Sequence, residues 1–344
     1  MVSLPDVVAS NARIPTTLPR NLVVVFAGAT TGIGEATLKA FVKYAVAPRI
    51  YFLARSPESA NRVAEECKLT NPQANFTIIK VDLSTVMQTD RACDEIKAKE
   101  KHVNLVVTSA GEVRLDLSPE GLHIALAAAF YTRIRIAQNL LPLLVAASKS
   151  STLARVVNVA GGTKEGQIFT DDLPGLKRPL YRIRGHIISM TTLAMETLSE
   201  QAPGVAFVHD YPGTVMTPLV DGVPGWVGIC LRLVAFILGG LLARWVCVPI
   251  EECGERHVFL GTSAKYPPKQ GAAVGVPTLG DVKATNGVDG AKNSGMYSVA
   301  WDCEDREKVV EILDGLRKKG TKELVWDHVN GEFERIKAGK GVDE

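Results

Sequence analysis

The sequence predicts an α/β fold built on a doubly wound parallel sheet. Apolar, β-branched runs alternate with stretches of helical periodicity through the first two thirds of the chain. The first run, residues 23–27, leads into a glycine-rich turn at residues 28–34, and a helical pattern follows at once. Strand–helix units repeated in this way form right-handed crossovers, which keep the strands parallel and place helices on both faces of the sheet.

The remaining elements follow in order along the chain. Strands are expected at residues 22–28, 49–54, 76–81, 104–108, 155–160 and 205–209. Helices are expected at residues 32–44, 57–69, 85–99, 121–147 and 186–201. Pro142 lies inside the longest helix and predicts a kink or a break there.

The two ends of the chain are expected to differ in character. Residues 1–20 read as an irregular leader, and residues 267–295 as a long surface loop rich in glycine and proline. Residues 296–301 are expected to form a late strand. Residues 303–336 have helical periodicity, so this tail should pack on the body of the domain.

We expect a single domain over residues 1–344, because the chain has no internal repeat and no second composition regime. Its core is predicted to span about residues 20–218, a lid and substrate region about 219–265, and a loop with a helical C-terminal extension about 266–344. The apolar run between Arg232 and Arg244 has only 11 residues, whereas a membrane span needs ~20. We therefore expect an apolar lid insertion and no transmembrane segment, with peripheral membrane contact as the alternative.

Charge and cysteine content exclude several classes of protein. The 39 basic and 37 acidic residues give a net charge of +2, which argues against a nucleic-acid partner. The 6 cysteines show no zinc or redox spacing, so no metal site is expected and the cysteines read as reduced core residues. Residues 1–21 contain prolines and no apolar h-region, so we expect a cytoplasmic protein without a signal peptide.

The glycine turn has the chemistry of a dinucleotide site. Gly28 allows the tight turn, Gly32 lets the backbone approach a pyrophosphate, and Gly34 allows close contact between helix and sheet. The helix that follows offers free N–H groups and a partial positive charge to an anion. A glycine turn alone is a weak signal, and a strand–turn–helix without a ligand is the alternative.

Together with later segments, this turn resembles the short-chain dehydrogenase/reductase family over about residues 20–218. The matching segments are residues 28–34, Asp82 after the third strand, Ser109-Ala110-Gly111 after the fourth, and Pro212-Gly213-Thr214-Val215-Met216-Thr217 after the sixth. The resemblance implies a Rossmann-like fold in which Asp82 meets the adenine and residues 109–111 lie beside the adenosine ribose. The segment from Pro212 would hold the nicotinamide amide and the pyrophosphate. Several looser matches are similar to a branch of longer fungal members.

The second strand bears on the choice of cofactor. It ends Leu53-Ala54-Arg55-Ser56, with no carboxylate to bind both ribose hydroxyls of NAD, and Arg55 offers a forked donor that suits a phosphate. We therefore expect NADP(H), with a solvated strand-end charge as the alternative for Arg55. The residues expected to bind the cofactor are Gly28, Thr30, Thr31, Gly32, Ile33, Gly34, Arg55, Asp82, Leu83, Ser109, Ala110, Gly111, Pro212, Gly213, Val215 and Thr217.

The sequence departs from the family at the positions that carry its chemistry. The resemblance implies a tetrad of asparagine, serine, tyrosine and a lysine four residues after the tyrosine. Here the asparagine position falls on Ala129 and the serine position on Gly161, with Ala160 before it. The tyrosine position falls near Pro179 and the lysine position near Ile183 or Arg184. No slip of the alignment restores a tyrosine–lysine pair, because no lysine lies between Lys177 and Lys265.

Three functions remain open. The first is a redox enzyme with substitute groups: Tyr181 as the acid, Arg184 as the cation, and Thr163 or Lys164 near the serine position. The second is a non-redox cyclase, isomerase or dehydratase on the same scaffold, and the third is a non-catalytic NADP(H)-binding protein. We favour the first, because hydride transfer belongs to the cofactor and an activated acceptor needs less help.

The partners can be predicted only by class. The apolar residues 223–248 stand at the family's lid position and suggest a lipophilic small-molecule substrate, such as a polyketide or terpenoid intermediate of specialised metabolism. Family members often pair through the long helix and its neighbour, which would give a homodimer, unless the extended tail covers that face. His186, His209 and Asp210 are interpreted as structural, and of Arg133 and Arg135 we expect one to be exposed and the other paired.

Overall fold

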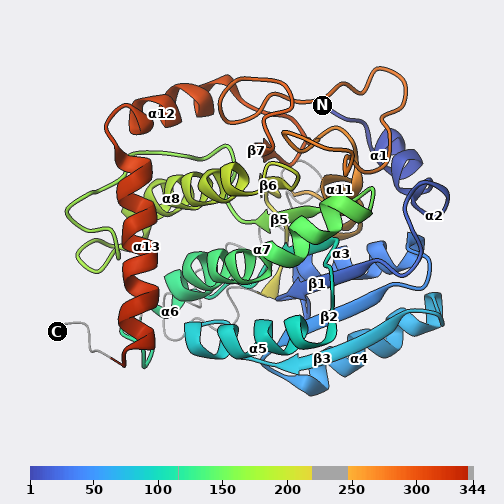
Figure 1. The fold of residues 1–344 in the computed structure, drawn as a ribbon, viewed down its shortest axis with the longest axis horizontal. Coiled ribbons are helices and arrows are strands. Elements are labelled where there is room, and N and C mark those ends of the chain that lie inside the picture. The colour runs from blue at the N-terminus through green and yellow to red at the C-terminus, as the bar shows by residue number, and fades with distance from the viewer. Residues whose placement is uncertain (115, 219–246, 340–344) are drawn as a thin grey trace.

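The computed structural model describes residues 1–114, 116–218 and 247–339 (Figure 1). Its centre is a seven-stranded sheet in the order β3-β2-β1-β4-β5-β6-β7, and every neighbouring pair of strands is parallel. The strands are β1 Val23–Ala27, β2 Arg49–Ala54, β3 Asn75–Lys80, β4 Leu105–Thr108, β5 Arg155–Val159, β6 Ala206–Tyr211 and β7 Met296–Ala300. The doubly wound parallel fold is therefore confirmed.

Helices cover both faces of this sheet. They are α1 Leu4–Asn11, α2 Ile14–Thr17, α3 Gly32–Tyr44, α4 Pro57–Thr70, α5 Val86–Lys99, α6 Ile124–Leu126, the π-helix η1 Ala127–Tyr131, α7 Thr132–Ser150, α8 Leu180–Gln201, α11 Ile250–Thr262, α12 Glu307–Arg317 and α13 Thr321–Lys337. Alternation along β1 divides the core: Val23 and Val25 pack with α5, α7, α8 and α13, whereas Val24 and Phe26 pack with α1, α3, α4 and α11. None of the helices among the described residues is long and apolar enough to cross a membrane.

The expectation of an irregular leader was wrong. Ser3 caps α1 by accepting a hydrogen bond from the Asp6 N–H at 3.3 Å, and Pro5 stands in the first turn, where no N–H partner is lost. Asn11 then donates to both the carbonyl oxygen and the carboxylate of Glu255 on α11, at 2.9 and 2.8 Å. The leader is thus a helical part of the domain, held by a contact that its own sequence does not reveal.

The long helix differs from the prediction at two points. α7 continues through Pro142, so the expected break there was wrong, and Leu140 and Leu144 on either side of the proline are buried. The irregularity lies upstream instead, in the π-helix Ala127–Tyr131. A π-turn shifts the helical register by one residue, and such turns are common at functional sites.

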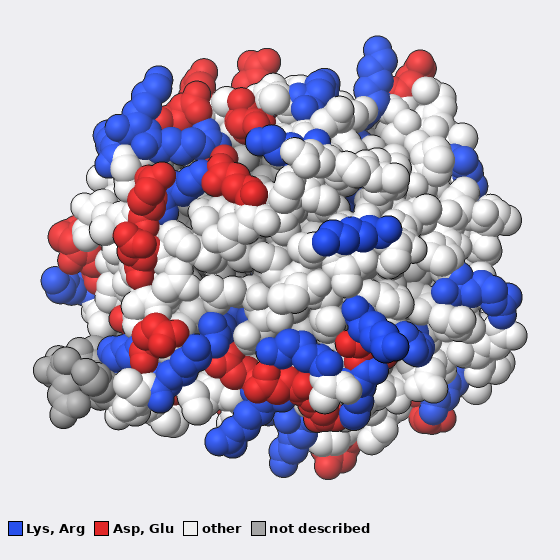
Figure 2. All heavy atoms as spheres, viewed as in Figure 1, with Lys and Arg blue, Asp and Glu red and all other residues white. Residues whose placement is uncertain are grey.

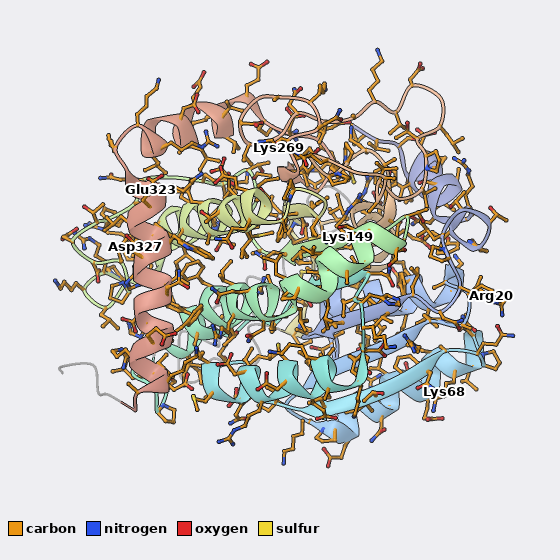
Figure 3. The ribbon with its side chains drawn as sticks, viewed as in Figure 1. Arg20, Lys68, Lys149, Lys269, Glu323 and Asp327 are labelled. Atoms are coloured by element: carbon orange, nitrogen blue, oxygen red, sulfur yellow. The ribbon has the colours of Figure 1, made fainter. Side chains whose placement is uncertain are left out.

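The C-terminal tail packs on the body as predicted. α13 lies across α8 and α5 at one side of the molecule (Figure 1). Its Val325, Val329 and Phe333 are buried in the same core as α7. The outer side of α13 carries exposed acidic residues, among them Glu323 and Asp327 (Figure 3). On the face shown in Figure 2, basic and acidic side chains are mixed around a largely uncharged centre.

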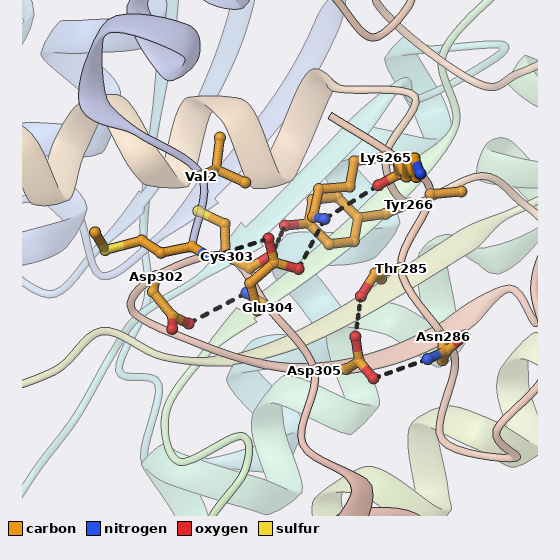
Figure 4. A network of polar contacts seen from close by, with 12 residues as sticks. Val2, Lys265, Tyr266, Thr285, Asn286, Asp302, Cys303, Glu304 and Asp305 are labelled. Carbon is orange, nitrogen blue, oxygen red and sulfur yellow. Dashed lines mark hydrogen bonds and ion pairs between the residues drawn. The ribbon is translucent and has the colours of Figure 1, made fainter. Parts of the chain in front are cut away.

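The glycine- and proline-rich loop after α11 is fixed by polar contacts rather than by regular structure (Figure 4). The Lys265 ammonium, which is 3% exposed as a residue, pairs with Glu304 at 2.9 Å. Asp305 accepts hydrogen bonds from Thr285 at 2.6 Å and Asn286 at 3.2 Å. These bonds tie residues 265–286 to the segment that follows β7. The predicted apolar lid falls largely on residues 219–246, which lie outside the described residues.

Candidate functional site

A cleft of about 780 Å³ opens at the carboxyl ends of the strands. It lies where the strand order turns back at β1 and β4, the position at which doubly wound sheets bind their ligands. Every residue that the sequence predicted to bind the cofactor lines this cleft, from Gly28 at one edge to Thr217 at another. The structure therefore brings segments from five separate strand ends, those of β1, β2, β3, β4 and β6, into one site.

Close packing explains the glycines of the turn after β1. Gly28 has a φ of +91°, and a Cβ there would lie 2.3 Å from the backbone nitrogen of Ala110. A Cβ at Gly34 would lie 2.3 Å from both the Gly28 carbonyl oxygen and the Ser109 hydroxyl. The same hydroxyl donates to the Gly28 carbonyl oxygen at 2.9 Å, which ties the end of β4 to the turn. No side chain larger than hydrogen fits at either glycine.

This cradle fits a pyrophosphate. α3 begins at Gly32, and its N-cap residue Thr31 makes no side-chain capping bond. The first N–H groups of the 13-residue helix therefore have no capping partner from that residue, and they carry the positive end of the helix dipole. A Cβ at Gly32 would contact Thr217 at 3.2 Å, so the start of α3 also touches the segment after β6.

The far end of the cleft lies at the start of α4. Arg55, Ser56 and Ser59 line it, and the Ser56 hydroxyl caps α4 by accepting the Ser59 N–H at 3.2 Å. The Arg55 side chain is 68% exposed and its nearest carboxylate is Glu112, at 3.6 Å. A guanidinium so weakly engaged can turn toward a phosphate.

Asp82 stands after β3 and shapes the neighbouring turn. Its Oδ1 accepts the Ser84 N–H at 3.0 Å and the Ser84 hydroxyl at 2.8 Å. The Asp82 N–H in turn donates to Gln88 at 2.9 Å. These bonds hold residues 82–84 in place along the cleft.

The residues that stand at the asparagine and serine positions of the tetrad line the other end of the cleft, away from α4. Ala129 lies in the π-helix and lines the cleft, as do Ala160 and Gly161 after β5. A Cβ at Gly161 would lie 2.5 Å from Cδ1 of Ile188. The isoleucine thus occupies the space that a serine side chain would need.

The register of α8 decides which residues near the expected tyrosine and lysine positions line the cleft. The residues of α8 that line the cleft follow helical spacing: Arg184, Ile187, Ile188 and Thr191. Ile183 is buried in the core instead, and Pro179 precedes the helix. Of the two residues expected near the lysine position, Arg184 lines the cleft and Ile183 packs in the hydrophobic core. No tyrosine or lysine lies among these cleft-lining residues of α8.

The predicted substitute groups meet the cleft only in part. Tyr181 is 77% exposed and does not line it, and the Arg182 guanidinium lies 5.8 Å from its ring centre. Thr163 does not line it either: its φ is +67° and its N–H donates to Ser298 at 2.7 Å. Arg184 does line the cleft. Tyr181, Thr163 and Lys164 thus lie outside the cleft lining.

Sequence reasoning missed Tyr211, the last residue of β6. Tyr211 lines the cleft. Its ring is near one cation on the loop after β5 and one cation on α8. Lys164 places its Nζ 5.0 Å from the ring centre, and the guanidinium carbon of Arg184 lies 5.9 Å from it. The signal that could have found Tyr211 is its position directly before Pro212-Gly213, a segment that was expected to line the site.

A buried polar network lies under this end of the cleft. His209 accepts the Gly161 N–H on Nε2 at 3.2 Å, so its proton is on Nδ1, which faces the Thr192 hydroxyl at 2.9 Å. Thr192 and Ser298 donate to the Glu165 carboxylate at 2.9 and 2.6 Å. Burial, aided by the positive charge of Arg133, lowers the pKa of His209 to about 3. His209 is thus a neutral, positioning residue, in keeping with its structural interpretation.

Arg133 holds the ends of β4 and β5 together. Its guanidinium donates to the Asn158 side chain at 2.8 Å and to the Val159 carbonyl at 2.7 Å, and it also bonds the Ala110 carbonyl. Burial lowers the pKa of Arg133 to about 10. Arg135 is buried as well and pairs with Asp90 at 2.8 Å, so the expectation that one of these arginines is exposed was wrong.

Asp210 anchors β6 to α11. Its Oδ2 lies 2.9 Å from Nε2 of His257, whose Nδ1 lies 2.6 Å from the Cys253 carbonyl oxygen. Both ring nitrogens therefore donate, and the Asp210 carboxylate outweighs burial and raises the pKa of His257 well above its usual value. Among the described residues no cluster of histidine, cysteine or carboxylate side chains has the makings of a metal site.

Comparisons with known proteins agree with this geometry. Residues 22–168 match the short chain dehydrogenase family. The chain is 36% identical over 335 residues to oxidoreductase AN1596 of Emericella nidulans, covering 95% of this chain and 97% of that one. It is 34% identical to oxidoreductase andH of Emericella variicolor, covering 92% of each. The solved structure of YwfH, described as an NADPH dependent reductase involved in bacilysin biosynthesis, shares the fold with a TM-score of 0.53 at 14% identity, over 70% of this chain and 91% of that one. The chain belongs to the short-chain dehydrogenase/reductase family of oxidoreductases.

Proposed function

We propose that the protein is an NADP(H)-dependent oxidoreductase that acts on a lipophilic small molecule in specialised metabolism, without the usual Asn-Ser-Tyr-Lys tetrad. The observation that carries the proposal is the cleft itself. One end is a glycine cradle at a helix N-terminus, and the other end is lined by small and aliphatic side chains together with a few polar ones, among them Arg184 and Tyr211. Bound there, the cofactor supplies the hydride.

NADP(H) is proposed because of the residues at the start of α4. Arg55, Ser56 and Ser59 offer a guanidinium and two hydroxyls at the end of β2, where a preference for NAD would call for a carboxylate. Glu112 lies 3.6 Å from Arg55, an exposed and loose pairing. A 2′-phosphate carries more charge than this carboxylate and would compete for the guanidinium.

A lipophilic substrate is proposed because of the opposite end. Its lining includes Ala128, Ala129, Val159, Ala160, Ile187 and Ile188. Small-molecule sites are commonly lined in this way, with a few polar groups that fix orientation. An apolar body therefore fits here better than a sugar or another strongly hydrated compound.

The filled serine position limits the chemistry that we propose. Because Ile188 fills the space beside Gly161, no hydroxyl from that position orients a carbonyl oxygen. A positioned proton donor is worth ~10²–10⁴ in rate. We therefore propose an acceptor that is already activated, such as an enone or an iminium, since its reduction depends less on such groups.

A non-redox reaction is the second candidate. It is favoured by one observation, namely that the residues of α8 lining the cleft include neither tyrosine nor lysine. A cyclase, isomerase or dehydratase would use the cleft to orient its substrate, which can contribute several kcal/mol to a unimolecular step (~7–11 at most).

Cofactor binding followed by turnover separates these candidates. The purified protein is titrated with NADPH and with NADP, followed by nicotinamide fluorescence, and is then offered carbonyl, imine and enone acceptors. We expect saturable NADPH binding and oxidation of NADPH with an activated acceptor. Binding without turnover on any acceptor would favour the non-redox candidate, and a protein that binds neither nucleotide would refute the proposal.

A further inference from the structure

The polar groups at the substrate end of the cleft fall into two classes. His209, Arg133 and Thr191 line this end, and each is engaged by protein atoms. His209 bonds Gly161 and Thr192, Arg133 bonds backbone carbonyls and Asn158, and Thr191 donates to the Ile187 carbonyl at 2.8 Å. They position the walls of the cleft and have little capacity left for a ligand.

Arg184 and Tyr211 form the second class, together with Lys164 beside them. Among the described residues, neither cation has a carboxylate partner, and each meets only the face of the Tyr211 ring. The acidic side chains that line the cleft, Asp82 and Glu112, stand near the glycine cradle and α4. Positive charge at this end is thus not neutralised by the residues that line the cleft.

The three residues come from separate elements that meet at the end of the sheet. Lys164 lies on the loop after β5, Arg184 on α8, and Tyr211 at the end of β6. The Lys164 Nζ lies 5.0 Å and the Arg184 guanidinium carbon 5.9 Å from the ring centre of Tyr211, so two positive charges are gathered around one residue. Arg184 lines the cleft, whereas Lys164 is exposed on the neighbouring loop and places its ammonium group at the ring of the cleft residue Tyr211.

We propose that Lys164, Arg184 and Tyr211 bind an anionic oxygen group of the substrate, a carboxylate or an enolate. The inference rests on the proposed function, because it assigns the substrate class of that same cleft. The substrate is then an amphipathic acid: its apolar body lies along Ala129, Ala160 and Ile188, and its acidic group meets the two cations. The Tyr211 hydroxyl adds a hydrogen-bond donor to the same group.

Matched pairs of probes test the charge requirement. Isothermal titration calorimetry compares 2-naphthoate with 2-naphthylmethanol, and 4-hydroxycoumarin with coumarin, at saturating NADPH and again without nucleotide. In each pair the ring system is the same and only the anionic group differs. We expect at least one anionic probe to bind about tenfold or more tightly than its neutral partner, the effect of a charge-assisted hydrogen bond. Which pair shows the difference separates a carboxylate site from an enolate site.

Variants place the effect on the named residues. In the wild-type protein, added sodium chloride should weaken binding of the anionic probe. K164A/R184A should remove both this salt effect and the preference for the anionic probe. Lys149→Ala, an exposed lysine on α7 (Figure 3), is the matched control and should leave both unchanged. Circular dichroism checks that each variant is folded.

The outcomes distinguish this inference from the proposed function. Equal affinities for the charged and neutral probes in both pairs would overturn the anion site, as would a preference that survives in folded K164A/R184A. Failure of NADPH to bind would refute the proposed function instead, while the probe comparison without nucleotide still decides the anion site.

Discussion

Ile188 on α8 fills the space beside Gly161 after β5: a Cβ at the glycine would lie 2.5 Å from the isoleucine Cδ1. A side chain at position 161 and the isoleucine at position 188 would therefore compete for the same volume. This end of the cleft is packed for an apolar surface.

Restoring the family's serine should therefore damage the protein. We expect Gly161→Ser to lower the free energy of unfolding by ~1–3 kcal/mol, the cost of overpacking a filled site. Urea denaturation measures this loss. The double variant G161S/I188A should recover much of it, and if G161S alone is as stable as wild type, the packing argument fails.

Arg55 should decide the choice between nucleotides. We expect Arg55→Ala to weaken NADPH binding by about ten- to a hundredfold, as expected from losing a charge-assisted contact to phosphate, and to change NADH binding little. Fluorescence titration with both nucleotides gives the ratio. The control is Arg20→Ala, which removes an exposed arginine that precedes β1 and lies outside the cleft lining (Figure 3). Equal effects of Arg55→Ala on NADPH and NADH would contradict the assignment.

His209 should make the fold sensitive to acid. Its pKa falls to about 3 in the folded state from an ordinary value of 6.5, so the unfolded chain binds its proton first as the pH drops. Stability from this group is thus complete above pH ~6.5 and is lost between ~6.5 and ~3, by at most ~1.4 kcal/mol per pH unit. Denaturation across this range should show a shallower acid loss in His209→Asn than in wild type, after correction for the variant's lower starting stability.

Substitution of Tyr181, near the start of α8, should affect turnover less than substitution of Tyr211, at the end of β6. Tyr181→Phe should leave substrate turnover unchanged, because this residue is 77% exposed and lies outside the cleft lining. Tyr211→Phe should lower kcat/KM by about tenfold or more, through loss of a hydroxyl that meets the substrate. Steady-state kinetics on a responsive acceptor compares the two. A large effect at Tyr181 with none at Tyr211 would reverse the assignment.

The cofactor half of the site could be predicted from the sequence because its requirements are local. The turn has no room for a Cβ at Gly28 or Gly34, so both positions require glycine. Glycines at this spacing can be recognised in the sequence without knowing the fold. The segments at Asp82, Ser109 and Pro212 each follow a strand, and parallel strands end at the same edge of a sheet. Local pattern and topology together were enough to bring these residues into one cleft.

The substrate half could not be predicted because it depends on packing between distant elements. Ile183 and Arg184 are neighbours in sequence, and only the docking of α8 decides that the first is buried and the second lines the cleft. The pairing of Tyr211 with Lys164 needs the loop after β5 to fold back over β6. Likewise, the leader becomes helical and fixed through Asn11 and Glu255, which are far apart in sequence. None of these contacts leaves a pattern in a single stretch of chain.

NADP(H) is proposed to bind in the cleft between Gly28 and Thr217. Fluorescence titration of the purified wild-type protein with NADPH and NADH tests it most directly. We expect saturable NADPH binding that is at least about tenfold tighter than NADH binding. Absence of NADPH binding by the folded protein, or a preference for NADH, would contradict it.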